Sequence, residues 1–298
     1  MKNPALSIIV IFHDMRREAK RTLYTLSTAY QSNICDTEYK IIAIDNGSTR
    51  PLSKDCVRKF GHNFKYHFFE TESKSPGSAV NFGANIASTE FIAVVVDGAR
   101  MVTPGVVDAS LRALQAVEDP FVCTLAWHLG PDVQNVSMCD GYDEVAEDQL
   151  LESIDWRDNG YRLFEIATIA QSSRVRIPGG MPSECSWFAM RRRTFIELGG
   201  FDERFQSPGG GLINHDFLKR ALSRSASNPS VILSEGSFHQ IHGGVATNVP
   251  IAEHPITAFL EEYQIIHGRP YVQELSPDPH YLGDLPPAAK RFFDESAQ

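Results

Sequence analysis

Continuous apolar runs alternate along the first half of the chain with segments whose apolar residues recur at helical spacing. The runs at 7–12, 40–44 and 91–96 are rich in β-branched residues, as expected of strands buried on both faces of a parallel sheet. Phe64, Tyr66 and Phe68 alternate with polar residues and predict a further strand. Another strand is expected over 121–129. The intervening segments 16–31 and 78–87 favour helices, and Thr103-Pro104 is typical of a helix start, with Thr103 as N-cap.

This alternation predicts an α/β fold with a mostly parallel sheet flanked by helices and joined by right-handed crossovers. After about residue 130 the periodicity weakens. Strands are predicted at 187–190 and 231–233, helices at 191–198, 215–224 and 255–267, and an irregular surface strap after Pro277. We therefore predict one domain over 1–245, with a nucleotide-binding half (1–130) and an acceptor or catalytic half (131–245). The segment 246–298 would pack a helix and an extended tail on the same domain.

Composition narrows the class of protein. The 298 residues carry a formal net charge of −9, which argues against a sequence-independent nucleic-acid binder, because such a protein needs a basic surface. No apolar run is long enough to span a bilayer. The five cysteines are scattered and form no Cys-x-x-Cys pair, so a reducing, cytoplasmic location is expected.

Aspartates follow three of the predicted strands: Asp14 after the first, Asp45 after the second and Asp97 after the fourth. Asp is also a common turn residue, so each alone is a weak signal. Ligands of open α/β sheets bind beyond the carboxyl ends of the strands, where these three would meet. The sequence therefore predicts a polar ligand site at that edge.

Five segments in fixed order resemble the family-2 glycosyltransferases over roughly residues 5–245. They are SIIVIFHD, IIAIDNGS, GSAVNFGANIASTEFIAVVVDGAR, GGFDERF and HDF. The resemblance implies the GT-A fold, a Rossmann-like fold for nucleotide-diphospho-sugar transferases. It also implies transfer of a sugar from a nucleotide-diphosphate sugar to an acceptor hydroxyl with inversion.

The resemblance also implies a donor site. Phe12 and Asp14 would line the pocket for base and ribose, and Asp45 would accept a hydrogen bond from the base. Gly77 and Asn81 would lie close to the nucleotide, as would Gly83, for which tight helix–sheet packing is the alternative. Asp97 and Gly98 would begin the Asp-x-Asp motif, and Arg100 would face the diphosphate or, alternatively, solvent.

The chain departs from that motif at Ala99, where the family usually has the acid that holds a divalent cation. A Mn²⁺ or Mg²⁺ ion would then need other ligands besides Asp97. The resemblance implies a histidine near 237–244, with His242 preferred and His239 second; a structural or acceptor-binding role is the alternative for each. Two other consequences of Ala99 are possible: the transfer uses no cation, or catalysis is lost.

Inverting transfer needs a base for the acceptor hydroxyl. Asp216 matches the family's catalytic acid, although His215 stands where the usual glutamate precedes it. A first-turn helix acid is the alternative for Asp216. The run Arg191-Arg192-Arg193 would bind an anionic acceptor or simply begin a solvated helix.

The expected function is thus glycosyl transfer in polysaccharide, cell-surface glycan or glycolipid synthesis. The acceptor would be a sugar, a polysaccharide or a lipid-linked molecule, and a lipid-linked one would bring peripheral membrane association. Ala99 and His215 support a rival: a GT-A protein that binds a nucleotide or sugar without transfer. A dinucleotide oxidoreductase is disfavoured because the first turn, His13 to Arg16, contains no glycine.

Overall fold

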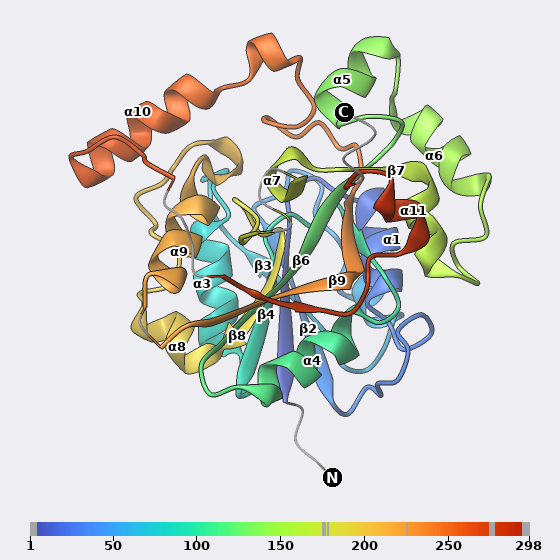
Figure 1. The fold of residues 1–298 in the computed structure, drawn as a ribbon, viewed down its shortest axis with the longest axis horizontal. Coiled ribbons are helices and arrows are strands. Elements are labelled where there is room, and N and C mark those ends of the chain that lie inside the picture. Colours follow the sequence, from blue (N-terminus) through green and yellow to red (C-terminus); the bar gives the residue numbers. More distant parts are fainter. Residues whose placement is uncertain (1–4, 175–176, 178, 225, 274–277, 294–298) are drawn as a thin grey trace.

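The computed structural model describes residues 5–174, 177, 179–224, 226–273 and 278–293, and these form one ten-stranded sheet (Figure 1). The path through the sheet is β10-β9-β6-β8-β4-β1-β2-β3, with β5 paired to β9 and β7 to β6. The strands are β1 (Leu6–Phe12), β2 (Tyr39–Asn46), β3 (Phe64–Phe69), β4 (Phe91–Val95), β5 (Arg100–Val102), β6 (Pro120–Leu129), β7 (Ala167–Ile169), β8 (Trp187–Arg191), β9 (Asn228–His239) and β10 (His280–Leu282).

Helices cover both faces of the sheet. The α-helices are α1 (Glu18–Thr25), α2 (Lys54–Arg58), α3 (Gly77–Ile86), α4 (Val106–Ala116), α5 (Gln134–Ser137), α6 (Glu144–Glu152), α7 (Gln171–Arg174), α8 (Arg192–Glu197), α9 (Ile213–Leu222), α10 (Ile256–His267) and α11 (Pro287–Lys290). Alternate residues of β1 point to opposite faces, so Ile8 and Val10 pack with α1, α2 and α4, whereas Ile9 and Ile11 pack with α3, α8 and α9. This two-sided burial explains the continuous apolar runs.

The predicted mostly parallel α/β sheet is confirmed. Strand β1 pairs in parallel with β2 and β4, β2 with β3, and β6 with β9. Strand β8 runs antiparallel between β4 and β6, which joins the first four strands to the second half of the chain. The division at residue 130 stays a prediction; strands from both sides of it belong to the same sheet.

The helix expected over 16–31 is shorter, because α1 ends at Thr25. The amide of Gln31 folds back and donates to the carbonyl of Thr25 at 2.7 Å and to that of Thr103 at 3.0 Å. The bond to Thr25 satisfies a carbonyl that a continued helix would have used, and apolar spacing alone could not reveal it.

The N-cap predicted at Thr103 is wrong by two residues, since α4 starts after Gly105. Thr103 is fully buried, and its hydroxyl accepts a hydrogen bond from the amide of Gly236 at 3.0 Å. The hydroxyl of Thr103 therefore binds the backbone of β9 and does not cap α4.

The second half contains more strand than predicted. Strand β9 has 12 residues, and β5, which the sequence pattern missed, pairs with its end. The tail beyond the undescribed Pro277 was predicted to be irregular, yet its described part adds β10 in parallel to β9 and the short helix α11. Helix α10 extends away from the sheet, and of its 12 residues only Phe259 and Tyr263 are buried (Figure 1).

Candidate active site

The three strand-end aspartates lie at the same edge of the sheet, as the sequence predicts. Phe12 at the end of β1 is the partner of Asp45 in β2, and β4 runs parallel to β1 with Asp97 just beyond its end. The end of β9 reaches this edge from the other half of the chain, because β6 and β9 are parallel and β5 pairs with β9 next to Asp97. Residues 140 positions apart in sequence therefore meet.

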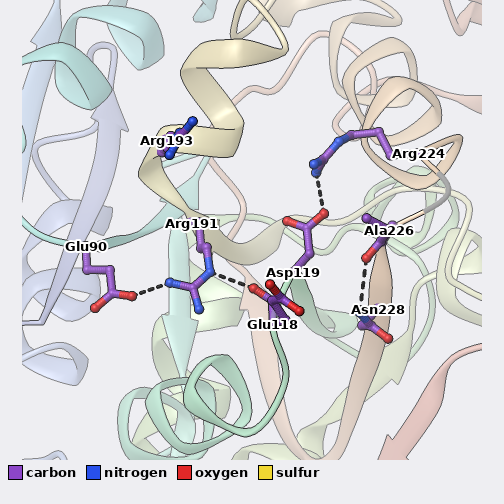
Figure 2. A pocket seen from close by; sticks show the side chains of 9 residues that line it. Glu90, Glu118, Asp119, Arg191, Arg193, Arg224, Ala226 and Asn228 are labelled. Carbon is purple, nitrogen blue, oxygen red and sulfur yellow. Dashed lines mark hydrogen bonds and ion pairs between the residues drawn. The ribbon is translucent and has the colours of Figure 1, made fainter.

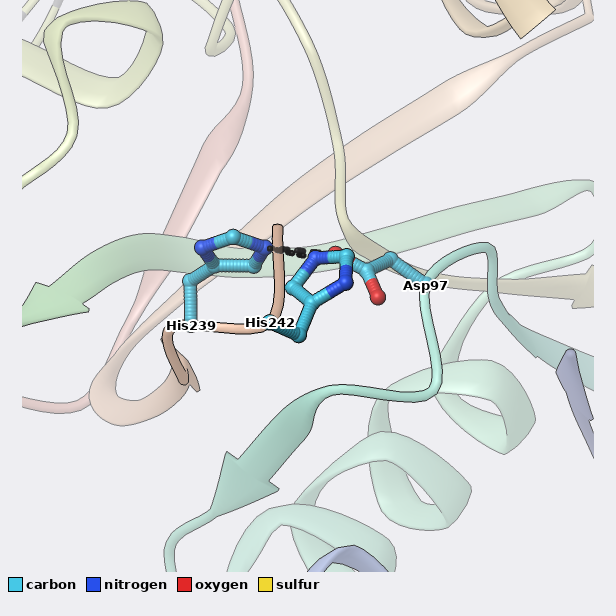
Figure 3. Close-up of side chains that lie close together, drawn as sticks. All are labelled: Asp97, His239 and His242. Atoms are coloured by element: carbon cyan, nitrogen blue, oxygen red, sulfur yellow. Dashed lines mark hydrogen bonds and ion pairs between the residues drawn. The ribbon is translucent and has the colours of Figure 1, made fainter. Parts of the chain in front are cut away.

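Asp97, His239 and His242 converge at this edge (Figure 3). Asp97 Oδ2 lies 2.6 Å from His239 Nε2 and 3.4 Å from His242 Nε2, and the two histidine Nε2 atoms are 3.1 Å apart. His239 is 1% exposed. The other oxygen of Asp97 accepts a hydrogen bond from the amide of Ala99 at 2.9 Å, which fixes the carboxylate orientation.

The tautomer of His239 follows from Gln134. The amide nitrogen of Gln134 donates to the carbonyl oxygen of His239 at 2.9 Å, so Gln134 Oε1 faces His239 Nδ1 at 2.7 Å. Asn248 Nδ2 donates a hydrogen bond to Gln134 Oε1 at 3.0 Å, which confirms that this atom is the oxygen. His239 Nδ1 therefore carries the proton, and the Nε2 lone pair faces the carboxylate of Asp97. A separation of 2.6 Å between Nε2 and Oδ2 suits a hydrogen bond when Nε2 carries a proton, or two ligands of one cation when it does not.

The charges around the cluster agree with this assignment. Burial lowers the pKa of His239 to about 4, so its imidazole is neutral near pH 7. Burial opposes the charge of Asp97, but His242 and His239 hold the pKa of this carboxyl well below its usual range. For His242, the attraction of Asp97 outweighs burial and raises the pKa.

The three ligand atoms fit one divalent cation. Around an octahedral ion with ligand distances of about 2.1 Å, neighbouring ligand atoms lie about 3 Å apart. The separations here are 2.6, 3.1 and 3.4 Å. Ala99 does not face the cluster, because its side chain is fully buried among apolar residues. The cluster thus takes its two histidines from the end of β9 and the loop that follows, and residue 99 contributes no side-chain atom to it.

Arg100 belongs to the same neighbourhood. It is the cross-strand partner of His239, and its charge interacts with Asp97 and with Glu184. Its Nε atom is buried and has no hydrogen-bond partner among the described residues. Arg100 is only partly exposed, so the alternative of a freely solvated loop arginine does not describe it.

Asp45 and Asp14 hold the loop that follows β2. The buried carboxylate of Asp45 accepts hydrogen bonds from the amides of Ser48 at 3.1 Å and Leu52 at 2.7 Å. The exposed carboxylate of Asp14 accepts from Thr49 and from the amide of Arg50, which lowers the pKa of Asp14 although burial opposes it. Both carboxylates therefore already accept hydrogen bonds from the loop that follows β2.

Phe12 and Gly98 pack against each other in the apolar core. Phe12 is fully buried, and a Cβ at Gly98 would lie 2.3 Å from its ring and 2.5 Å from the carbonyl oxygen of Ile11. The same close approach explains two glycines of α3. A Cβ at Gly77 would lie 2.7 Å from Ile213, and one at Gly83 would lie 2.6 Å from Ile9. Gly83 therefore fits the alternative of tight packing between helix α3 and the sheet.

Asn81 ties α3 to the loop after α8. Its amide nitrogen donates to the carbonyl of Phe201 at 2.9 Å and to Glu203 at 2.8 Å, and its oxygen accepts from the amide of Phe201 at 2.8 Å. All its hydrogen-bonding atoms thus have partners within the protein.

Replacing Asn81 by alanine is therefore expected to lower the free energy of unfolding by about 2 kcal/mol, because Phe201 keeps buried backbone groups without partners. Nucleotide affinity should stay unchanged if the residue is structural. Urea denaturation and calorimetry would measure the two effects, with Ser78→Ala, which loses only the bond to Glu203, as the matched control. Weakened nucleotide binding in a stable variant would instead support the donor-site role.

Asp216 does not present a free carboxylate. It is 3% exposed at the side chain, and its Oδ2 accepts from Arg220 Nε at 2.8 Å within α9. Its Oδ1 lies 3.1 Å from His267 Nε2 at the end of α10. Together with Asp202 these side chains form a second compact group of acids and histidine. The role of Asp216 as base stays a prediction.

The sequence analysis missed two residues that lie near the cluster. Asn214 in the first turn of α9 is 5% exposed and donates to Glu184 Oε1 at 3.3 Å and to the carbonyl of Cys185 at 3.0 Å. Its own oxygen is buried and has no partner in the described chain. No spacing or motif marks Glu184, which lies three residues before β8, so only the tertiary structure reveals this pair.

A pocket of about 800 Å³ lies at the opposite edge of the sheet (Figure 2). Its arginines are already paired. Arg191 contacts Glu90, Arg193 lies 2.6 Å from Glu197, and Arg224 lies 2.7 Å from Asp119. Arg192 donates to the last carbonyls of α3, those of residues 84 and 85. Within the described chain, the arginine run therefore makes local contacts: Arg191 and Arg193 pair with acids, and Arg192 bonds backbone carbonyls of α3.

Comparison with known proteins agrees with the fold. The profile of the family described as glycosyltransferase like family 2 matches residues 7–242. The chain belongs to this family. No curated protein sequence matches it.

Among solved structures, residues 1–349 of S. aureus TarS in complex with UDP-GlcNAc are similar, with a TM-score of 0.55 and 15% identity over 88% of this chain and 65% of that one. The mannosyltransferase PcManGT from Pyrobaculum calidifontis, in complex with GDP-Man and Mn²⁺, gives a TM-score of 0.52 and 13% identity over 100% of this chain and 70% of that one. In another structure of residues 1–349 of S. aureus TarS, the match covers 57% of that solved chain. The fold is thus the GT-A glycosyltransferase fold.

Within the part of the chain that the structure describes, every helix is too short or too polar to cross a lipid bilayer.

Proposed function

We propose that this chain transfers a sugar from a nucleoside-diphosphate donor to an acceptor hydroxyl, with a divalent cation held by Asp97, His239 and His242. The convergence of these three side chains carries the proposal, because their donor atoms are spaced like neighbouring ligands of one ion. Two imidazoles and one carboxylate suit Mn²⁺ better than Mg²⁺, which prefers oxygen ligands and keeps its waters. When bound, such an ion would neutralise charge on the diphosphate leaving group.

The protein's own residues would supply the remaining contacts. Arg100 projects beside the cluster with an unpaired Nε, and guanidinium groups bind phosphate oxygens well. The neighbours TarS and PcManGT bind UDP-GlcNAc and GDP-Man, so a nucleotide sugar is the donor class we propose. The base and ribose would lie along the ends of β1 and β2. There, Asp14 and Asp45 hold the loop that follows β2.

A single displacement with inversion is the course that we propose for the reaction. The acceptor would be a sugar, polysaccharide or lipid-linked hydroxyl, in glycan or glycolipid synthesis. A cytoplasmic location belongs to the same proposal, and the five cysteines, all unpaired, suit a reducing compartment.

Titration calorimetry with UDP, GDP and other nucleoside diphosphates, with and without Mn²⁺, tests the donor site. We expect one nucleotide to bind more tightly with Mn²⁺, and His242→Ala to lose most of that gain while the protein remains folded. His254→Ala is the matched control, because the ring of His254 contacts Phe259 of α10 edge to face and is not part of the cluster. Equal Mn²⁺ dependence in His242→Ala and wild type would remove His242 from the cation site.

Binding without turnover is the second candidate function, favoured by the buried, paired state of Asp216. Release of nucleoside diphosphate from a nucleotide sugar, with water as acceptor, separates the two candidates. Tight nucleotide binding with no release from any donor would support the binder and contradict transfer.

A further inference from the structure

The acids between residues 184 and 262 differ in how many partners they already have. Asp216 is buried between Arg220 and His267, and Asp202 is paired with Arg204 at 2.6 Å. Glu203 accepts from Ser78 and Asn81, and Glu262 accepts from the amides of residues 206 and 207. Glu184 is different, because among the described residues it forms no ion pair and accepts only the 3.3 Å bond from Asn214.

The fold places Glu184 beside the cation cluster. It precedes Ser186, whose hydroxyl lies 2.7 Å from that of Ser237 in β9, two residues before His239. Arg100, the cross-strand partner of His239, interacts with the charges of both Asp97 and Glu184. The guanidinium of Arg100 is thus close enough to both carboxylates for their charges to act on it, and the side chain of Glu184 is only partly covered.

Both residues that interact with this carboxylate carry an unsatisfied polar atom. Among the described residues, Asn214 Oδ1 is a buried acceptor without a partner, and Arg100 Nε is a buried donor without a partner. Buried polar groups are costly unless something satisfies them, so such atoms near one carboxylate indicate a ligand. A sugar offers hydroxyl groups that both donate and accept hydrogen bonds, and it would satisfy both atoms at once.

We propose that Glu184 is the base that takes the proton from the attacking acceptor hydroxyl. This inference rests on the proposed function. The acceptor oxygen forms the bond to the anomeric carbon, and the bond from that carbon to the diphosphate oxygen breaks. The nucleoside diphosphate leaves with the electron pair, and the proton passes from the hydroxyl to the Glu184 carboxylate and then to solvent. Asn214 is a positioning residue, because its amide orients Glu184.

Glu184→Gln tests the proposal with water as the acceptor. The donor is the one that wild type cleaves fastest among UDP-glucose, UDP-GlcNAc and GDP-mannose, and the readout is release of nucleoside diphosphate with Mn²⁺. We expect kcat to fall about 100-fold or more, as for loss of a general base, while KM for the donor changes little. Glutamine keeps the size of the side chain and an oxygen that accepts from Asn214, so the fold should persist; a thermal melt checks this.

Azide separates loss of a base from general damage. Azide is already an anion and has no proton to lose, so it attacks the anomeric carbon without a base. In Glu184→Gln, added azide should restore release of nucleoside diphosphate to near the wild-type rate and give a glycosyl azide. Glu203→Gln is the matched control, an acid of the same type that bonds Ser78 and Asn81, and it should hydrolyse the donor at the wild-type rate without azide.

Three results would overturn the proposal, and they are distinguishable. Unchanged hydrolysis by Glu184→Gln, with an active wild type, would exclude Glu184 alone. If folded Asp216→Asn loses nucleoside-diphosphate release and azide restores it, while Glu184→Gln stays close to wild type, the base is Asp216. A wild-type protein that releases nucleoside diphosphate from none of the donors would overturn the proposed function itself, and Glu184 with it.

Discussion

Asp97→Asn is expected to remove divalent-cation binding and most of the transfer activity. The carboxylate is the only anionic ligand in the cluster, and without it the neutral His239 and His242 hold a cation weakly. Loss of even an outer-shell partner of a metal typically costs about 10–100-fold in affinity, so loss of this ligand should cost at least that much. Loss of charge stabilisation at the leaving group should lower kcat by about 10²–10³-fold.

Manganese binding, followed by electron paramagnetic resonance, and nucleoside-diphosphate release measure the two effects. Asp108→Asn is the matched control, because Asp108 lies on the surface of α4 and pairs only with Arg112 at 3.0 Å. Wild-type Mn²⁺ affinity in Asp97→Asn would contradict the cation site at this cluster. Wild-type affinity together with lost release would assign Asp97 a role in the chemistry without a cation.

Asp216→Ala is expected to be the most destabilising single change among the charged residues of α9. The carboxylate is almost fully buried, accepts a hydrogen bond from Arg220 and contacts His267, so its removal leaves the guanidinium of Arg220 without its anionic partner. Removal of one member of a buried ion pair typically costs about 3 kcal/mol or more in the free energy of unfolding. The variant should also loosen the end of α10, where His267 contacts Asp216.

Urea denaturation of Asp216→Ala, Arg220→Met and the double variant measures the pair itself. The double variant should lose less free energy of unfolding than the two single variants together, because Arg220 no longer has an ion pair to lose once Asp216 is replaced. Strict additivity would mean that the ion pair contributes nothing. Little change in stability for Asp216→Ala would favour a carboxylate that is free to act as a base.

The strand-end acids show how much of the site the sequence could predict. Asp14, Asp45 and Asp97 could be assigned to one edge because parallel strands that alternate with helices have their carboxyl ends together. Their tasks could not be assigned in the same way. Asp45 and Asp97 both follow an apolar run, yet one binds two turn amides and the other faces two histidines.

The cation ligands illustrate a second limit. His239 and His242 were preferred as ligands from the family resemblance, and the structure brings both to Asp97, although their role as ligands stays a proposal. Their distance from Asp97 depends on β5, a strand of three residues that pairs with the end of β9. So short a strand has no periodicity to detect, and the pairing spans about half of the chain.

The sequence by itself determined the α/β class, the positions of the main buried strands and the edge of the sheet that holds the polar residues. These features depend on local apolar patterns, which are set by burial on one or both faces of each element. Only the tertiary structure decided which polar atoms have partners. It paired Asp216 with Arg220 and placed the side chain of Ala99 in the core. Among the described residues, it gave Glu184 a single hydrogen bond, from Asn214. Partner choice depends on distances between residues far apart in the chain, and no local pattern encodes those distances.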